Sequence, residues 1–135
     1  MKDCYCCSGE TFEDCCQPFI EGIEKPPTAE NLMRSRYSAY VIVNVEYLLQ
    51  TTHPSTRKFH DASAIQEWAR SCNWQKLEII STTQGNRQDK NAVVEFKAYY
   101  LDSDLKTQIH HEVSNFVKEL GKWFFVDGKI SNDLK

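Results

Sequence analysis

The sequence lacks the long hydrophobic runs that would place a protein in a membrane. A helix that crosses a bilayer needs about 20 mostly apolar residues. The longest apolar stretch here, YVIVNVEYLL, is short and contains Asn44 and Glu46. The first residues also lack the basic and apolar regions of a secretory signal. We therefore predict a cytoplasmic protein that does not insert into a membrane.

Short catalytic signatures are also missing. The sequence contains no nucleophile elbow, no glycine-rich loop that cradles a phosphate and no HExxH zinc-protease motif. It has no internal repeat and no low-complexity segment. These absences favour a binding protein over an enzyme, although they leave the question of catalysis open.

Clustered positive charge is absent from the N-terminal part. The 135-residue chain has a net charge of -3, and residues 1–25 hold two lysines against six acidic residues. Binding to a phosphate backbone needs clustered Lys and Arg, so association with RNA or the ribosome through this end is disfavoured. The apolar and charged fractions, 41% and 26%, are those of a globular protein of one domain with room for a small extra module.

Cysteine, in contrast, is concentrated at the start of the chain, where five of the six cysteines lie between Cys4 and Cys16. A reducing cytoplasm disfavours disulfides, and adjacent cysteines cannot easily bridge to each other. Thiolates that converge on one Zn²⁺ ion fit the spacing better, because zinc accepts sulfur ligands in a tetrahedron. Zinc would also give a short segment with almost no core a reason to fold.

The stretch CYCCSGETFEDCC resembles the SEC-C zinc motif, which has a Cys-x-Cys-Gly-Ser-Gly start, a central aromatic residue and a Cys-Cys or Cys-His end. The resemblance implies one zinc ion with the ligands Cys4, Cys6, Cys15 and Cys16. Cys7 stands where the motif has glycine, which suggests a position with a special backbone angle. Its thiol could be a spare group, a competing ligand or a redox-sensitive neighbour.

A site closed by four sulfur ligands indicates a structural role for the zinc, since catalytic zinc sites usually keep one position open. Cys72 lies far along the chain at the end of an apolar helical pattern. We interpret it as a small buried hydrophobic residue rather than as a ligand or a nucleophile.

The rest of the chain predicts helices first and strands afterwards. After Pro26–Pro27, Thr28 is the expected N-cap of a helix over residues 29–41. A second helix is predicted over 45–50, HPSTRKF breaks the pattern, and Asp61 is expected to cap a third helix that ends near Cys72. Alternating patterns then predict four strands, at 74–84, 91–102, 106–119 and 122–130.

Helices followed by a strand meander predict an α+β fold with helices packed on one face of an antiparallel sheet. This order is compatible with the cone-like fold of nuclear transport factor two (NTF2), ketosteroid isomerase and scytalone dehydratase. More specifically, the chain resembles the YchJ family of bacterial proteins of unknown activity. The resemblance lies in the stretches LMRSRYSAY, THPSTR and HEVSNF and in the later DG. The resemblance implies a SEC-C module at residues 1–25 joined to an NTF2-like domain at 26–135. Some relatives carry a second SEC-C motif at the C-terminus, which is not seen here.

In the cone fold the helices and the curved sheet enclose a pocket, which is the default place for a ligand. One of the two arginines in MRSRYSAYV could face this pocket and bind an anionic group. The alternative, which we slightly favour, is that both lie at the surface or pair with nearby acids. The residues predicted to line the pocket are Arg34, Arg36, Tyr37, Tyr40, His53, Glu112 and Ser114.

Two of these residues are weak candidates for acid–base chemistry. His53 could be a general base at the rim of the pocket, but it more simply fixes a loop before Pro54. Glu112 shares a strand face with Ser114 and Phe116, so burial is expected to raise its pKa and make it a candidate base. The alternative, which we favour, is that Glu112 pairs with Arg34 or Arg36.

Three functions follow from these features. The leading hypothesis is a zinc-containing adaptor or binding protein, whose SEC-C module docks on a macromolecular partner and whose cone domain binds a small molecule or a peptide. The second is an enzyme of the ketosteroid isomerase or dehydratase type that works in the pocket. The third and weakest is association with the ribosome or RNA.

Overall fold

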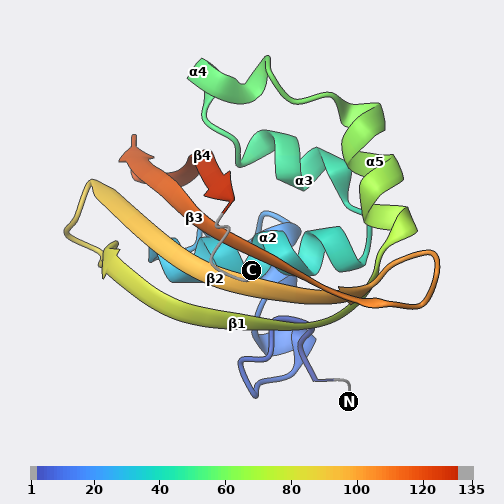
Figure 1. The fold of residues 1–135 in the computed structure, drawn as a ribbon. Helices are drawn as coiled ribbons and strands as arrows, with labels where there is room; N and C mark the ends of the chain where they lie inside the picture. Colours follow the sequence, from blue (N-terminus) through green and yellow to red (C-terminus); the bar gives the residue numbers. More distant parts are fainter. Residues whose placement is uncertain (1–2, 131–135) are drawn as a thin grey trace.

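The computed structural model describes residues 3–130, and in this range a set of helices packs on one face of a curved four-stranded sheet (Figure 1). The helical elements are η1 (Phe12–Asp14), α1 (Gln17–Ile20), α2 (Ala29–Val41), α3 (Val45–Gln50), α4 (Pro54–Arg57) and α5 (Ala62–Ser71). The strands are β1 (Asn73–Gln84), β2 (Asn91–Leu101), β3 (Thr107–Glu119) and β4 (Lys122–Ile130). The predicted α+β fold is confirmed.

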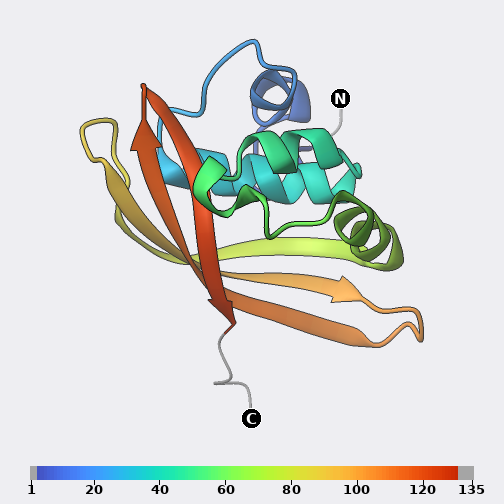
Figure 2. The same ribbon diagram turned by 90° about the horizontal axis from the view of Figure 1, so that it is seen from above.

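The sheet is an antiparallel meander in the order β1-β2-β3-β4. Register shifts interrupt β1 at two places and the β3–β4 pairing at one, between Asn115 and Phe116. Such bulges increase the local twist of a strand and bend the sheet. The result is a concave inner face that holds α2 and α3 (Figure 2).

Local capping fixes where the helices begin. The Thr28 hydroxyl accepts a hydrogen bond from the Asn31 amide at 3.1 Å, and Asp61 accepts one from the Ala64 amide at 3.0 Å. Both predicted N-caps are therefore confirmed. The start of α2 is also held by the sheet, because the Ala29 amide donates to the carbonyl of Gly85 at 3.0 Å.

Besides the short 3-10 turn η1, two α-helical turns were not expected. The segment HPSTRKF was predicted to break the helical pattern, yet Pro54–Arg57 forms α4 with His53 as its N-cap. Proline suits the first turn of a helix because its missing N–H would have no partner there. The second unexpected turn, α1, follows the last two cysteines of the N-terminal cluster.

The core lies between the inner face of the sheet and helices α2 and α3. On β2, Val94, Phe96 and Ala98 alternate along the strand and are buried, whereas Tyr100, the next residue on that face, is only partly buried. Cys72, predicted to be buried, is also only partly buried at the end of α5. The core is continuous with the N-terminal segment, since three of its cysteines pack in the same cluster of buried residues.

Among residues 3–130, no helix has the length and apolarity that crossing a membrane requires.

Candidate functional site

Four cysteine sulfurs converge in the N-terminal segment. The Sγ atoms of Cys4, Cys6, Cys15 and Cys16 all lie within 4.8 Å of one another. The Sγ of Cys15 is 3.5 Å from that of Cys6 and 3.8 Å from that of Cys16. Hydrogen bonds from the thiols of Cys16 and Cys6 lower the pKa of Cys4, which favours a thiolate. This cluster is suited to hold one metal ion.

The turn between the two halves of the cluster is held by short-range contacts. The Cys4 amide donates to the Glu10 carbonyl at 2.8 Å, which closes the loop. The Ser8 hydroxyl lies 3.2 Å from the Cys15 sulfur. Cys7 is exposed and has a φ of 66°. This left-handed conformation is the special backbone angle expected where the motif has glycine, and it points to the backbone rather than the thiol as the constraint at this position.

Helix α2 holds the cysteine segment from one side. The hydroxyl of Ser38, which is fully buried, lies 3.7 Å from the Cys4 sulfur. Arg34 donates from Nη1 to the Cys6 carbonyl at 2.7 Å and from Nε to Glu30 at 2.9 Å. Arg34 was predicted to line the pocket, but these contacts commit it to the cysteine segment.

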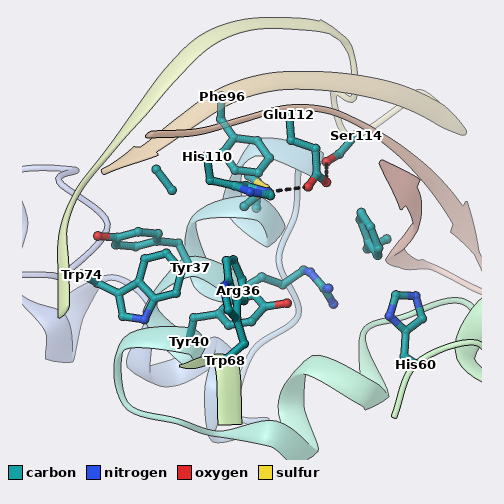
Figure 3. A pocket seen from close by; sticks show the side chains of 13 residues that line it. Arg36, Tyr37, Tyr40, His60, Trp68, Trp74, Phe96, His110, Glu112 and Ser114 are labelled. Carbon is teal, nitrogen blue, oxygen red and sulfur yellow. Dashed lines mark hydrogen bonds and ion pairs between the residues drawn. The ribbon is translucent and has the colours of Figure 1, made fainter. Parts of the chain in front are cut away.

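On its other side α2 forms a wall of a cavity of about 170 Å³. The opposite wall is the inner face of the sheet, and α5 closes one end (Figure 3). Of the seven residues predicted to line a pocket, five line this cavity: Arg36, Tyr37, Tyr40, Glu112 and Ser114. The other lining residues are Met33, His60, Trp68, Trp74, Phe96, Ala98, His110 and Phe125.

Arg36 is a buried cation in this wall, with only 6% of its surface exposed. Its Nη1 donates to the Leu48 carbonyl at 2.9 Å and to the Thr51 hydroxyl at 2.7 Å, with the Thr52 hydroxyl at 3.4 Å. The guanidinium carbon lies 4.5 Å from the centre of the Phe125 ring. Burial lowers the pKa of Arg36 from its usual value, because the charged form loses its water.

Glu112 pairs with its own strand rather than with an arginine. His110 Nε2 lies 2.7 Å from Glu112 Oε1, and the Ser114 hydroxyl donates to Oε2 at 2.5 Å (Figure 3). Within residues 3–130 the predicted ion pair to Arg34 or Arg36 is not formed. Burial alone would raise the pKa of Glu112, but the bonds from His110 and Ser114 and the charge of Arg36 lower it overall. The predicted rise in its pKa was therefore wrong.

Gly128 makes room for this carboxylate. It pairs with Ser114 across the β3–β4 ladder. A Cβ atom added at Gly128 would lie 2.5 Å from Glu112 Cδ and would overlap its carboxylate oxygen. The absence of a side chain at Gly128 therefore leaves the space that the partly buried Glu112 carboxylate occupies.

Aromatic rings make up most of the cavity wall. Trp68 stands edge-to-face on Trp74 at 5.1 Å and on Tyr40 at 5.5 Å. Burial raises the pKa of Tyr37 and of Tyr40, so both phenols stay protonated. The cavity thus combines a largely apolar lining with a few convergent polar groups, as ligand sites usually do.

His53 lies elsewhere, outside the lining of the cavity. Its Nδ1 accepts a hydrogen bond from the Ser55 amide at 3.1 Å, and its Nε2 is 2.9 Å from a Glu119 oxygen. The His53 amide donates to the Phe125 carbonyl at 2.7 Å. These contacts fix the turn into α4, which is the loop-fixing role that the sequence favoured for His53.

Sequence reasoning missed several cavity residues. His110 carried a usable signal, because the alternation that places Glu112 and Ser114 on one strand face also places His110 there. Trp68 falls within the third helix that the sequence predicts, but nothing in the helical pattern indicates that it lines a cavity. His60 lies in the loop before α5, and no periodic pattern could have indicated its position.

Comparisons with known proteins match this architecture. A sequence model of the YchJ middle, NTF2-like domain matches residues 28–128. A UPF0225 protein of Geobacter sulfurreducens is 42% identical over 125 residues, which cover 93% of this chain and 77% of that protein. A UPF0225 protein of Actinobacillus succinogenes is 42% identical over 127 residues, covering 94% of this chain and 81% of the other.

Two solved structures are similar over almost all of the chain. The solution structure of a SEC-C motif containing protein from Rhodopseudomonas palustris has a TM-score of 0.89 and 31% identity, and covers 97% of this chain and all of the other. The crystal structure of a SEC-C motif containing protein from Psychrobacter arcticus has a TM-score of 0.78 and 38% identity, over 95% of this chain and 77% of the other. With the domain match and these identities, the chain belongs to the YchJ family, whose members are also named UPF0225 proteins.

Proposed function

We propose that this protein is a zinc-containing cytoplasmic binding protein, with a cysteine module that docks on a protein partner and a cavity that receives a small ligand. The observation that carries the proposal is that α2 contacts the cysteine segment on one side and lines the cavity on the other. Ser38 and Arg34 contact the cysteine segment, while Arg36 and Tyr40 line the cavity. One helix therefore supports both sites.

The donor set supports zinc as the metal. A Zn–S bond of about 2.3 Å in a tetrahedron places the sulfurs about 3.8 Å apart. Two of the sulfur separations, 3.5 Å for Cys6–Cys15 and 3.8 Å for Cys15–Cys16, are close to that value. Four sulfur ligands would leave no open position for water, which gives the ion a structural role. In this proposal residues 1–25 form the zinc module and residues 26–135 the cone domain.

The free side of the module favours a partner with a basic surface. Glu10, Glu13 and Asp14 are exposed near the cluster, whereas the opposite side is covered by α2. The same negative charge would repel a nucleic acid backbone. We therefore assign the docking role to a protein surface rather than to RNA.

Native mass spectrometry of the purified protein tests the metal first, with an expected mass increase of one zinc ion.

The docking role is tested by affinity capture with Glu13→Lys/Asp14→Lys, which leaves all cysteines in place. The matched control, Glu67→Lys/Asp104→Lys, reverses two equally exposed charges on α5 and in the β2–β3 turn. Loss of a partner with the first variant alone supports docking through the module. Identical partner lists for both variants would rule it out.

A second candidate function is proton-transfer catalysis in the cavity. The observation that favours it is the His110–Glu112 contact of 2.7 Å inside a largely apolar space. A carboxylate that holds an imidazole can set its tautomer and support acid–base chemistry. Incubation of a metabolite extract in deuterium oxide with the wild type and with Glu112→Gln is the test. Deuterium incorporation that requires Glu112 supports an enzyme, and none with either protein leaves the binding function alone.

A further inference from the structure

Arg36 has a buried positive charge without an anionic partner. All three of its hydrogen bonds come from one nitrogen, Nη1, and all three acceptors are uncharged. Across residues 3–130, neither Nε nor Nη2 has an acceptor, and no carboxylate lies within ion-pair distance of the guanidinium. A buried charge is costly unless it is paired. The free N–H groups of Nε and Nη2 therefore mark a place where an anion would be stabilised.

The remaining ionisable groups in the cavity do not supply that anion. Both oxygens of Glu112 are engaged, one by His110 and one by Ser114. Burial and the charge of Arg36 lower the pKa of His60, so His60 is neutral at physiological pH. Arg36 thus remains the permanent cation of the cavity, and Nε and Nη2 form the edge of a guanidinium that grips a carboxylate with two parallel hydrogen bonds.

The apolar part of the cavity sets the rest of the ligand. The cavity volume is about 170 Å³. An apolar cavity of about 150 Å³ is large enough to hold a benzene ring. The rings of Tyr40, Trp68 and Trp74 line the space, and such rings favour stacked or edge-to-face contact with another ring. Figure 3 shows Arg36 and Glu112 reaching into this space from opposite walls.

We infer that the cavity binds a small aromatic carboxylate, with the carboxylate on Nε and Nη2 of Arg36 and the ring against Tyr40, Trp68 and Trp74. This inference rests on the proposed function, because it names the chemical class of the ligand that the cavity receives. It assigns Arg36 as the anchor that separates an anionic ligand from a neutral one of the same shape.

The test compares benzoate with benzamide, which has the same ring and nearly the same shape but no charge. Each is titrated into ¹⁵N-labelled wild-type protein and followed by the indole N–H signals of Trp68 and Trp74 and by the backbone amides of β2 and β3. We expect saturable shifts with both probes and at least tenfold tighter binding of benzoate.

Arg36→Lys then tests the anchor. Lysine keeps the positive charge but cannot donate the two parallel hydrogen bonds that Nε and Nη2 of arginine provide. The matched control is Arg70→Lys on the exposed side of α5. Benzoate affinity should fall at least tenfold in the first variant and stay unchanged in the second. Far-UV circular dichroism shows whether each variant is folded, and the wild-type comparison of the two probes holds even if Arg36→Lys is not.

The possible results separate the two levels of the proposal. Equal binding of benzoate and benzamide would overturn the anionic ligand class but leave the cavity as a ligand site. Failure of both probes to bind at millimolar concentration would overturn the ligand-binding function as well. A benzoate preference that survives in folded Arg36→Lys would show that another group is the anchor.

Discussion

At the scale of single residues, Cys7 shows a conflict between side chain and backbone. Its φ of 66° lies in the left-handed region. That region costs a residue with a Cβ atom about 1–2 kcal/mol. The thiol is exposed and lies outside the cluster of four sulfurs. The backbone strain at Cys7 therefore arises from the turn and does not involve a residue of the four-sulfur cluster.

Cys7→Gly should raise the free energy of unfolding by about 0.5–1 kcal/mol, because relief of the backbone strain exceeds the extra entropy that glycine adds to the unfolded chain. Urea denaturation of the metal-loaded proteins measures the change. Cys7→Ala serves as the control, since it removes the thiol but keeps the Cβ atom. An equal gain in Cys7→Ala would assign the effect to the thiol instead.

Glu112 makes a residue-scale prediction about pH. Its pKa is lowered in the folded protein, in which His110, Ser114 and the charge of Arg36 outweigh the effect of burial. A lowered pKa stabilises the fold fully above the unfolded value of about 4.3, and this stabilisation is lost as the pH falls through the folded value.

Wild-type protein should therefore lose more stability than Glu112→Gln when the pH falls from about 6 to below about 4. The measurement is the melting temperature of both proteins across this range. Any acid-induced loss of metal occurs in both, so only the difference between them reports Glu112. Parallel pH curves would show that the carboxylate is not stabilised by the fold.

At the scale of elements, α2 connects two sites because polar side chains on its two sides make different contacts. The sharpest of these contacts to test is that of Ser38 with the Cys4 sulfur at 3.7 Å. Groups that hydrogen-bond to a metal ligand orient it, and their loss typically costs about 10–100-fold in metal affinity.

Ser38→Ala should therefore release the proposed zinc ion to a chromogenic chelator about tenfold faster than the wild type. Ser35→Ala is the matched control, because Ser35 is equally buried on α2 but bonds to the Tyr47 hydroxyl at 2.6 Å. It should change stability without changing zinc release. Faster release in both variants would mean that α2 affects the metal only through general stability.

The β3–β4 ladder makes another element-scale prediction. The methyl group that Gly128→Ala adds would overlap the Glu112 side chain. The substitution should therefore destabilise the protein by about 1–3 kcal/mol. In a Glu112→Ala background the overlapping atoms are gone, so the same change at Gly128 should cost far less. A double-mutant cycle by urea denaturation measures this coupling, and additive effects of the two substitutions would show that Gly128 does not serve Glu112.

The elements also show what could be predicted from the sequence. The four strands were expected within one residue of their observed ends, because alternation and turn residues act locally. The α4 turn was missed, since its one turn is held by His53 and Pro54 against β4 rather than by a periodic pattern. Arg34 and Arg36 could not be separated, because which arginine meets the cavity depends on where the cysteine segment packs on α2.

At the scale of the whole molecule, the N-terminal segment does not form a separately packed unit beside the cone domain. Cys4, Cys6 and Cys16 are buried in the same core as Leu32 and Ala39 of α2. Figure 2 shows this segment packed beside α2, with the sheet on the other side of the helices. Metal bound by the four cysteines would therefore stabilise more of the chain than the module itself, because binding free energy becomes folding free energy.

Removal of the proposed zinc ion by a chelator should consequently loosen α2 as well as the cysteine segment. Hydrogen–deuterium exchange before and after chelation measures this effect residue by residue. We expect the amides of residues 3–20 and of α2 (Ala29–Val41) to lose protection, while those at the centres of β2 and β3 keep most of theirs. Added zinc should restore the original pattern, which controls for damage by the chelator. Exchange that increases only before Pro26 would show instead that the cysteine segment folds independently of the helix that lines the cavity.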